Sequence, residues 1–246
     1  MKPLALDLFC GAGGATKGLQ CAGFHVTGVD IRPQPKYCGD LFYEADAMTF
    51  PLDGYDFIWA SPPCQAHTTM KSMWNAKDHA DLIPATRTRL ISSGLPWTME
   101  NVPGSTLMDG GFFLCGSMFG LGVEVYDGWR QLRRHRWFES TIHVLVPPCR
   151  HNGPTIGFYG DHARDRRRKA GVRDRGLDFP DADKLELGRK AMDMPWSDWA
   201  GISQAIPPAY SEFIGRQVME LLEHSADRQQ QRREKREAEL RELVTL

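Results

Sequence analysis

The sequence predicts an α/β fold in which a doubly wound, mostly parallel sheet carries a small additional module. Short apolar segments alternate with helical stretches along the first 140 residues, and this alternation is typical of parallel strands joined by right-handed crossovers. The segments rich in glycine, proline and polar residues directly follow the apolar segments. Because ligands bind at the carboxyl ends of parallel strands, we expect these segments to meet in one site.

Five apolar segments are expected to form strands, with helices between and after them. The first covers residues 4–9 and leads through a glycine turn into a helix over 15–22, which Gly23 ends. The other strands are expected at 24–30, 56–60, 97–102 and 136–140, with an edge segment at 42–45, and the other helices at about 80–92 and 211–224.

Composition divides the chain into four regions. Residues 1–140 carry the alternating segments and are expected to form the core. Residues 141–195 are rich in glycine, proline, arginine and aspartate and are expected to form a small module. Residues 196–225 are expected to return to the core. Residues 226–246 form a charged tail, for which helical i,i+4 charge pairs predict a helix.

The bulk composition is that of a soluble globular protein, with 41% hydrophobic and 25% charged residues. No apolar run approaches the roughly 18 residues of a membrane-spanning helix, and the first run is too short for a signal peptide. We therefore expect a cytoplasmic protein with no membrane partner. The six cysteines include no CxxC pair, which favours free thiols over disulfides.

Positive charge is concentrated locally, although the net charge is only −1. Between residues 161 and 175 there are seven lysines and arginines against three aspartates, and a second cluster consists of Arg130, Arg133, Arg134 and Arg136. Local clusters of this kind bind phosphates whatever the total charge is. The alternative is a solvated loop that binds nothing.

A glycine turn joins the first strand to the first helix, in the sequence Phe9-Cys10-Gly11-Ala12-Gly13-Gly14. Glycines let a ligand approach the backbone closely. Asp30 ends the next strand, where a carboxylate can accept hydrogen bonds from ribose hydroxyls, and Asp46 could lie beside an adenine ring. The pattern fits an adenosine-containing cofactor without separating NAD from S-adenosylmethionine. The G-x-G-x-x-G spacing is incomplete because position 16 is threonine, and a turn that serves only packing is the alternative.

The string Ser61-Pro62-Pro63-Cys64-Gln65 is the most specific short motif of the chain. Two prolines fix a rigid turn directly after a strand and would hold the Cys64 thiol above the sheet edge. Such presentation suits covalent catalysis, although a buried structural cysteine is far commoner. Glu100 ends the next strand, where a carboxyl group in a pocket can hold a proton at neutral pH. An exposed charge is the alternative for Glu100.

Together these motifs resemble those of the DNA (cytosine-5)-methyltransferases. Asp7-Leu8 with the glycine turn, the Pro-Pro-Cys loop and Glu100-Asn101-Val102 occur in that order and at suitable spacing. Residues 134–138 resemble the family's Arg-x-Arg strand, and residues 203–208 with Ile214-Gly215 resemble its C-terminal motif. The resemblance spans about residues 4–218 and suggests a compact, phage-type member.

The resemblance implies a Rossmann-like enzyme, acting as a monomer in the cytoplasm of a bacterium or an infected host cell, that methylates C5 of cytosine in duplex DNA. Cys64 would add to C6 of a flipped-out cytosine, and Glu100 would hydrogen-bond its N3 and exocyclic amine. Arg134 and Arg136 would support the base and the thiolate. S-adenosyl-L-methionine would bind along the residues Phe9, Cys10, Gly11, Ala12, Gly13, Asp30, Ile31, Asp46, Pro62 and Gln204.

Two positions depart from the family's pattern. Leu132 stands where the family usually has glutamine, and Ser203-Gln204 stands where it usually has Gly-Asn, which leaves the roles of Arg134 and Gln204 open. Only about 60 residues separate the Arg-x-Arg segment from the C-terminal motif, so we expect a short recognition sequence. Within that region the basic run 164–175 is expected to contact phosphates.

Cys149 and His151 invite a zinc interpretation, but a tetrahedral site needs a second pair of ligands. The sequence shows no such pair, and we expect no metal. Three functional alternatives stay open: an RNA (tRNA) cytosine-5 methyltransferase, a catalytically silent relative that binds nucleic acid, and an enzyme that transfers a group other than methyl.

Overall fold

The computed structural model describes residues 2–63, 81–105, 111–126, 128–160, 162–165 and 181–224. Three of the features expected from the sequence lie outside these ranges. They are the Cys64 thiol, most of the basic run 164–175, and the charged tail 226–246.

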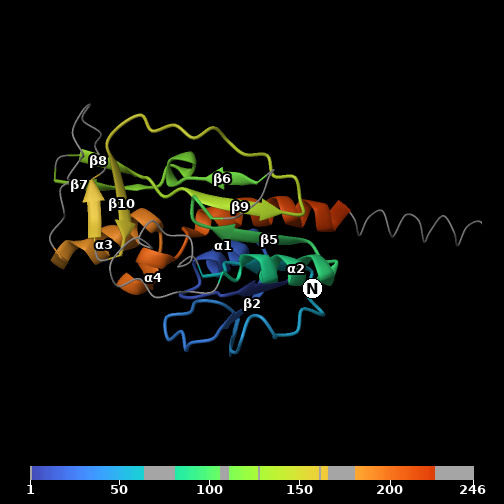
Figure 1. The fold of residues 1–246 in the computed structure, drawn as a ribbon. Helices are drawn as coiled ribbons and strands as arrows, with labels where there is room; N and C mark the ends of the chain where they lie inside the picture. Colours follow the sequence, from blue (N-terminus) through green and yellow to red (C-terminus); the bar gives the residue numbers. More distant parts are fainter. Residues whose placement is uncertain are drawn as a thin grey trace, which may run out of the picture.

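A seven-stranded sheet forms the centre of the molecule (Figure 1). Its strand order is β3-β2-β1-β4-β5-β9-β6. The five strands from β3 to β5 are parallel, whereas β9 is antiparallel to both of its neighbours. This is the mostly parallel sheet that the sequence predicts. The strands are β1 (Leu4–Leu8), β2 (His25–Asp30), β3 (Leu41–Glu44), β4 (Phe57–Ala60), β5 (Trp97–Asn101), β6 (Phe112–Leu114) and β9 (Arg136–Ser140).

Helices cover both faces of this sheet. α1 (Gly14–Ala22) and the helix over residues 208–224 pack on one face, and α2 (Ile83–Ser93) packs on the other. Alternate side chains of β4 therefore enter the two apolar layers, and all four are fully buried. A strand covered on both faces has a continuous apolar sequence, which is why β4 is recognisable in the sequence. None of the described helices is long and apolar enough to cross a bilayer.

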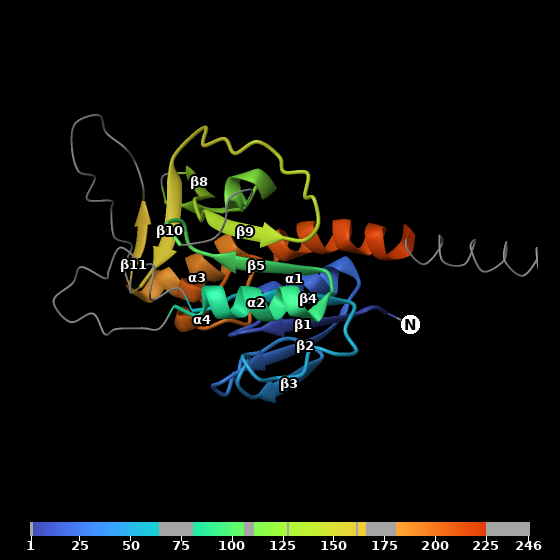
Figure 2. The same cartoon turned by 45° about the vertical axis from the view of Figure 1, so that its right-hand side comes forward.

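A second sheet of four strands, in the order β11-β10-β8-β7, lies at one end of the large one (Figures 1 and 2). Two helices pack against it and share its apolar cluster. Its elements are β7 (Gly122–Val125), β8 (Gly128–Leu132), β10 (Thr155–Tyr159), β11 (His162–Asp165), α3 (Asp181–Met192) and α4 (Trp199–Gln204).

Two separate segments of the chain form the small sheet. β7 and β8 precede β9, which belongs to the large sheet, and β10 and β11 follow it. A module that begins at residue 141 stays a prediction, because the small sheet draws on residues from both sides of that position.

Candidate functional site

The loops with the expected site residues leave the carboxyl ends of neighbouring strands. β1 leads into the glycine turn, β2 ends at Asp30, β4 leads into the Pro-Pro turn, and β5 contains Glu100. These strands lie in the order β2-β1-β4-β5. Because they are parallel, their carboxyl ends form one continuous edge of the sheet, the usual place for a ligand site.

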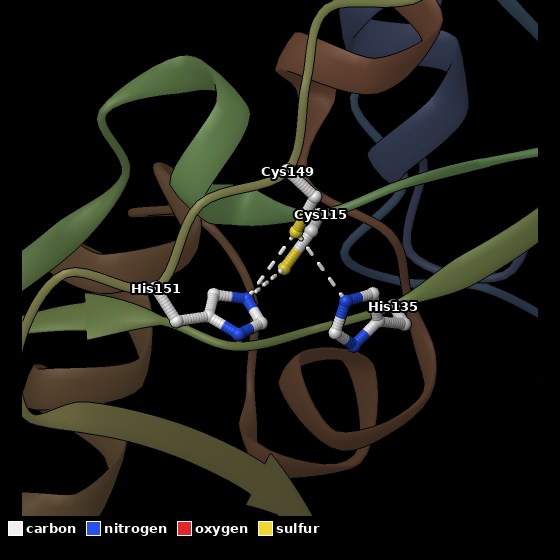
Figure 3. Close-up of side chains that lie close together, drawn as sticks. All are labelled: Cys115, His135, Cys149 and His151. Carbon is white, nitrogen blue, oxygen red and sulfur yellow. Dashed lines mark hydrogen bonds between the residues drawn. The ribbon is translucent and has the colours of Figure 1, made fainter.

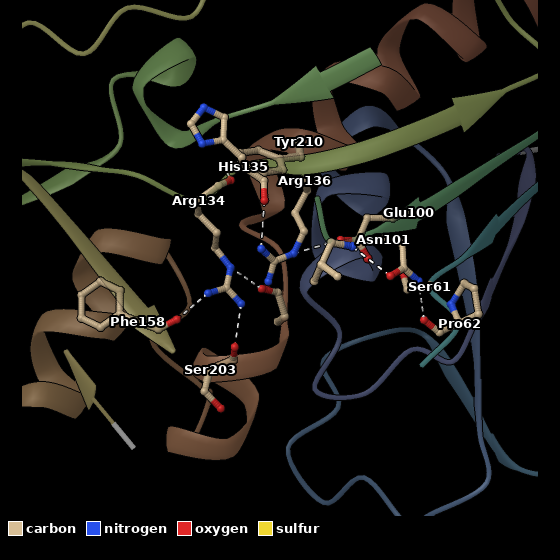
Figure 4. Close-up of polar contacts among 12 residues, drawn as sticks. Ser61, Pro62, Glu100, Asn101, Arg134, His135, Arg136, Phe158, Ser203 and Tyr210 are labelled. Carbon is tan, nitrogen blue, oxygen red and sulfur yellow. Dashed lines mark hydrogen bonds and ion pairs between the residues drawn. The ribbon is translucent and has the colours of Figure 1, made fainter. Parts of the chain in front are cut away.

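Hydrogen bonds fix the turn that leads to Cys64. Asn101 Nδ2 donates to the carbonyl oxygen of Pro62 at 2.9 Å (Figure 4), and the Ser61 N–H donates to the carbonyl oxygen of Leu8 at 3.1 Å. Asn101 and Pro62 are both buried, so this carbonyl would be costly to leave unpaired. The segment that ends two residues before Cys64 is thus anchored to β1 and β5.

Glu100 lies in a buried electrostatic pair with Arg136. Its Oε1 is 3.0 Å from Arg136 Nε, and both side chains are at least nine-tenths buried (Figure 4). Burial raises the pKa of Glu100, while Arg136, Arg134 and a hydrogen bond from Ser61 lower it. Burial prevails, so the pKa lies above that of an ordinary glutamate.

The Glu100 carboxyl group retains acceptor capacity. No donor among the described residues is aligned for a hydrogen bond with Oε1, despite the short distance to Arg136. A buried carboxyl group with a raised pKa and an unsatisfied oxygen can both donate to and accept from a polar ligand that enters the pocket. The edge of a pyrimidine base offers such groups.

The Arg134 guanidinium donates hydrogen bonds to backbone carbonyl oxygens. It is fully buried and donates to Phe158 at 2.7 Å, Ala205 at 2.8 Å and Ser203 at 2.9 Å (Figure 4). Burial, followed by the charge of Arg136, lowers its pKa to about 9. These contacts join β10 to the carboxyl end of α4, so the geometry favours a positioning role over direct contact with a substrate. A catalytic role for Arg134 stays a prediction.

The glycine turn is tied to Asp30, as a cofactor loop would be. Gly11 has a φ of 50°, and its N–H donates to Asp30 Oδ2 at 3.0 Å. A Cβ on Gly11 would meet nothing within 4 Å, so this stretch of backbone is open to a ligand. Phe9 also has a positive φ, of 61°, a strained conformation that is often found at binding sites.

Residues on both sides of α4, Trp196 and Ile206, pack against the same turn. Trp196 Nε1 donates to the carbonyl oxygen of Ala12 at 2.9 Å. A Cβ on Gly14 would collide with the backbone carbonyl of Ile206. Glycine is therefore required at position 14 for packing.

The ten residues expected to bind the cofactor differ in exposure. Ile31 is 68% exposed, and Asp46 and Gln204 are exposed as well. Burial strongly raises the pKa of the Cys10 thiol, with Asp7 and Asp30 adding to the effect, which makes Cys10 a poor nucleophile. Buried or half-buried positions are occupied by Phe9, Cys10, Gly11, Ala12, Gly13, Asp30 and Pro62.

Asp7 is a buried acid for which the sequence predicts no separate role. It is fully buried in β1, and its Oδ2 accepts from Thr16 Oγ1 at 2.5 Å. Burial raises its pKa to about 7; the Thr16 hydrogen bonds lower it, and the charges of Asp30 and Glu100 raise it further. It links β1 to α1 directly beneath the glycine turn.

Sequence reasoning also missed the surroundings of Cys149 and His151. The structure brings Cys115 and His135 next to them. These two residues are twenty positions apart and lie at the ends of different strands, so no local spacing could have identified them.

The fold has solved counterparts, although no family model and no curated protein matches the chain. A DNA modification methyltransferase encoded within an Escherichia coli prophage aligns with a TM-score of 0.53 and 16% identity, covering 90% of this chain and 99% of that one. The Dnmt2 methyltransferase of S. pombe aligns with a TM-score of 0.52 and 13% identity, over 90% and 99% of the two chains. The Entamoeba histolytica methyltransferase EhMeth aligns with a TM-score of 0.53 and 10% identity, with the same coverage.

At these identities the likeness establishes the fold. It confirms the doubly wound, Rossmann-like α/β architecture that the sequence predicts, shared along nearly the whole length of three methyltransferases.

Proposed function

We propose that this protein transfers a methyl group from S-adenosylmethionine to C5 of cytosine in duplex DNA, with Cys64 as the nucleophile. The observation that carries the proposal is the buried Glu100–Arg136 pair at 3.0 Å, whose neighbour Asn101 holds the Pro62 turn. A carboxyl group able to bind a cytosine edge thus adjoins the segment that presents the thiol. The structural likeness to a prophage DNA modification methyltransferase supports the same chemistry.

The reaction starts with addition of the Cys64 thiolate to C6 of the cytosine. The S–C6 bond forms, and the electron pair of the C5–C6 double bond moves toward C5. Protonated Glu100 donates a hydrogen bond to N3 and so stabilises the negative charge that develops on the ring. Its raised pKa favours the protonated form of the carboxyl group.

C5, now electron-rich, takes the methyl group. S-adenosylmethionine, when bound, would supply that group from its sulfonium sulfur, which would keep the electron pair of the broken S–CH3 bond and leave as the neutral thioether of S-adenosylhomocysteine. A water or hydroxide then removes the C5 proton, and the released electron pair re-forms the double bond and expels the Cys64 thiolate from C6. The cytosine has gained a methyl group and lost a proton, and the thiolate is regenerated.

The glycine turn fits this cofactor. Gly11 leaves open space beside the backbone, and Asp30, bonded to its N–H, presents a carboxylate at the end of β2 suited to ribose hydroxyls. The proposed cofactor contacts are Phe9, Cys10, Gly11, Ala12, Gly13, Asp30, Ile31, Asp46, Pro62 and Gln204.

Arg136 and Arg134 have different roles in the proposed mechanism. Arg136 holds the Glu100 carboxyl group, and its positive charge favours a thiolate nearby. Arg134 holds the carboxyl end of α4 in place, where the glycine turn packs. In duplex DNA the target cytosine must swing out of the helix to reach them, with the basic run 164–175 contacting phosphates.

The test is mass spectrometry of nucleosides from duplex DNA that has been incubated with the full-length protein and S-adenosylmethionine. Wild type is expected to produce 5-methyldeoxycytidine, and Cys64→Ser none. Cys21→Ser is the matched control, because Cys21 is an exposed cysteine at the end of α1 and its loss should leave the yield unchanged. Duplex DNA with 5-fluorocytosine should form a covalent complex with wild type and with Cys21→Ser, but not with Cys64→Ser.

Other outcomes would overturn parts of the proposal. Equal product from wild type and Cys64→Ser would remove the nucleophile assignment. Product on tRNA and none on DNA would establish the RNA alternative. A mass increase other than that of methyl would identify a different transferred group, and binding of DNA without product or covalent complex would indicate a silent relative.

A further inference from the structure

Four side chains with metal-binding atoms converge at one end of β9, outside the site described above. They are Cys115, His135, Cys149 and His151, and their ligand atoms all lie within 4.8 Å of one another (Figure 3). Both thiols are free. Cys149 Sγ is 3.4 Å from His151 Nε2 and 3.5 Å from His135 Nε2, and Cys115 Sγ is 3.4 Å from His151 Nε2.

These distances match the edges of a zinc tetrahedron. With Zn–S bonds of about 2.3 Å and Zn–N bonds of about 2.0 Å, the sulfur and nitrogen ligands of a tetrahedral ion are about 3.5 Å apart. Three S–N separations of 3.4–3.5 Å in the cluster agree with this spacing. Two cysteines with two histidines form a donor set that selects Zn²⁺.

The surroundings supply hydrogen bonds to the sulfurs, and contacts of this kind orient the ligands of a metal ion. The Cys115 sulfur accepts from the backbone N–H of Met118 in the 3-10 helix Gly116–Phe119, and Ser117 Oγ is 3.6 Å from Cys149 Sγ. Cys115 is fully buried, whereas His151 is exposed. One ligand of the site therefore lies in the core and another at the surface, so an ion could reach the site from solvent.

We propose that Cys115, His135, Cys149 and His151 form a structural Zn²⁺ site. Four protein ligands complete the tetrahedron and leave no position for a substrate, so the site is structural. It would tie the segment 141–154, which has no regular secondary structure, to the end of β6 and the start of β9. Residue 135 also lies between the two arginines of the active-site region, so the ion would fix the backbone from which both extend.

The first measurement is the zinc content of the purified full-length protein by inductively coupled plasma mass spectrometry. Wild type is expected to carry about one zinc per chain, and His151→Ala a small fraction of that. Because His151 is exposed, its replacement should leave the fold intact. His143→Ala is the matched control, since His143 is an exposed histidine of the same segment and lies outside the cluster; it should retain the zinc.

Metal removal tests the structural role without a mutation. A chelator should lower the Tm of wild type by roughly 5–10 °C and leave the Tm of His151→Ala nearly unchanged. Cobalt(II) added to the metal-free wild type should give the intense visible absorption of a tetrahedral thiolate complex. Added zinc should restore the Tm.

Three results would overturn the proposal. These are wild type and His151→Ala with equally little zinc, wild type that carries iron, and a Cys115–Cys149 disulfide found by peptide mapping of protein purified under reducing conditions. None of these readouts depends on methyl transfer. The proposed zinc site can therefore be refuted while the proposed enzyme activity is confirmed, and the activity can be refuted while the zinc site is confirmed.

Discussion

Replacement of Asp7 by asparagine is expected to abolish a pH-dependent loss of stability. Asp7 is fully buried, and its Oδ1 has no hydrogen-bond partner among the described residues. Burial raises its pKa from 3.8 to about 7, against the lowering effect of the Thr16 hydrogen bonds. Asparagine has the same shape, and its amide oxygen can still accept from Thr16, so the variant mimics the protonated acid.

The size of the effect follows from the two pKa values. The folded protein keeps the Asp7 proton until the pH nears 7, whereas the unfolded chain gives it up near 3.8. The contribution of the raised Asp7 pKa to the free energy of unfolding is therefore fully present below about pH 4. It falls by about 1.4 kcal/mol per pH unit until the pH passes 7. Between pH 5 and pH 7, wild type should lose about 2 kcal/mol relative to Asp7→Asn.

Urea unfolding of both proteins at pH 5, 6, 7 and 8 measures this difference. The free energy of unfolding of wild type should fall steadily relative to that of Asp7→Asn from pH 5 to pH 7. Above pH 7 the difference between the two should stay constant. Asp53→Asn replaces an exposed carboxylate in a turn and should follow wild type throughout. If the wild-type and Asp7→Asn curves stay parallel from pH 5 to pH 8, Asp7 does not hold its proton in the folded protein and the reasoning from burial fails.

Two further predictions concern other buried polar contacts. Arg87 of α2 donates to both carboxylate oxygens of the buried Glu139 in β9, at 3.0–3.1 Å. Arg87→Met should therefore lower the free energy of unfolding by about 3 kcal/mol, because it leaves a buried charge unpaired. In urea titrations, Arg87→Met with Glu139→Gln should recover part of the loss, and an unchanged deficit in the double variant would contradict this. Asn101→Ala removes the bond that holds the Pro62 carbonyl, so it should lower kcat for methyl transfer about 100-fold while leaving KM for S-adenosylmethionine near its wild-type value. An unchanged kcat with a raised KM would show that Asn101 supports cofactor binding instead.

The central strands of the large sheet, β1, β2, β4 and β5, were predictable because they are buried on both faces. β4 is a continuous apolar run, β1 is apolar apart from Asp7, and glycine or proline turns follow them. Asp30 and Glu100 were recognised at strand ends for the same reason, since polar residues that follow such runs must lie at the sheet edge. The local sequence was therefore sufficient to predict the position of a residue wherever that position depends only on the strand that contains it.

The small sheet was less predictable because its strands contain charged residues. In the small sheet, β8 includes Arg130, which is 2% exposed, and β9 of the large sheet likewise includes Glu139, which is 4% exposed. In sequence such residues indicate an exposed surface. Their burial depends on partners far along the chain, such as Arg87 for Glu139, 52 residues away. The cluster of two cysteines and two histidines was missed on the same grounds, since Cys115 and His151 are 36 residues apart.

The segment 134–136 shows how neighbouring residues can serve different parts of one protein. Arg136 begins β9 and pairs with Glu100 in the large sheet. Arg134 precedes the strand and bonds to carbonyls of β10 and of the segment that ends α4. His135 between them faces the two cysteines. Because a shift of this backbone would disturb all three contacts together, the loops held by the small sheet are coupled to the carboxyl group proposed to bind the cytosine. An ion at His135 would therefore stabilise the geometry of Glu100 without touching it.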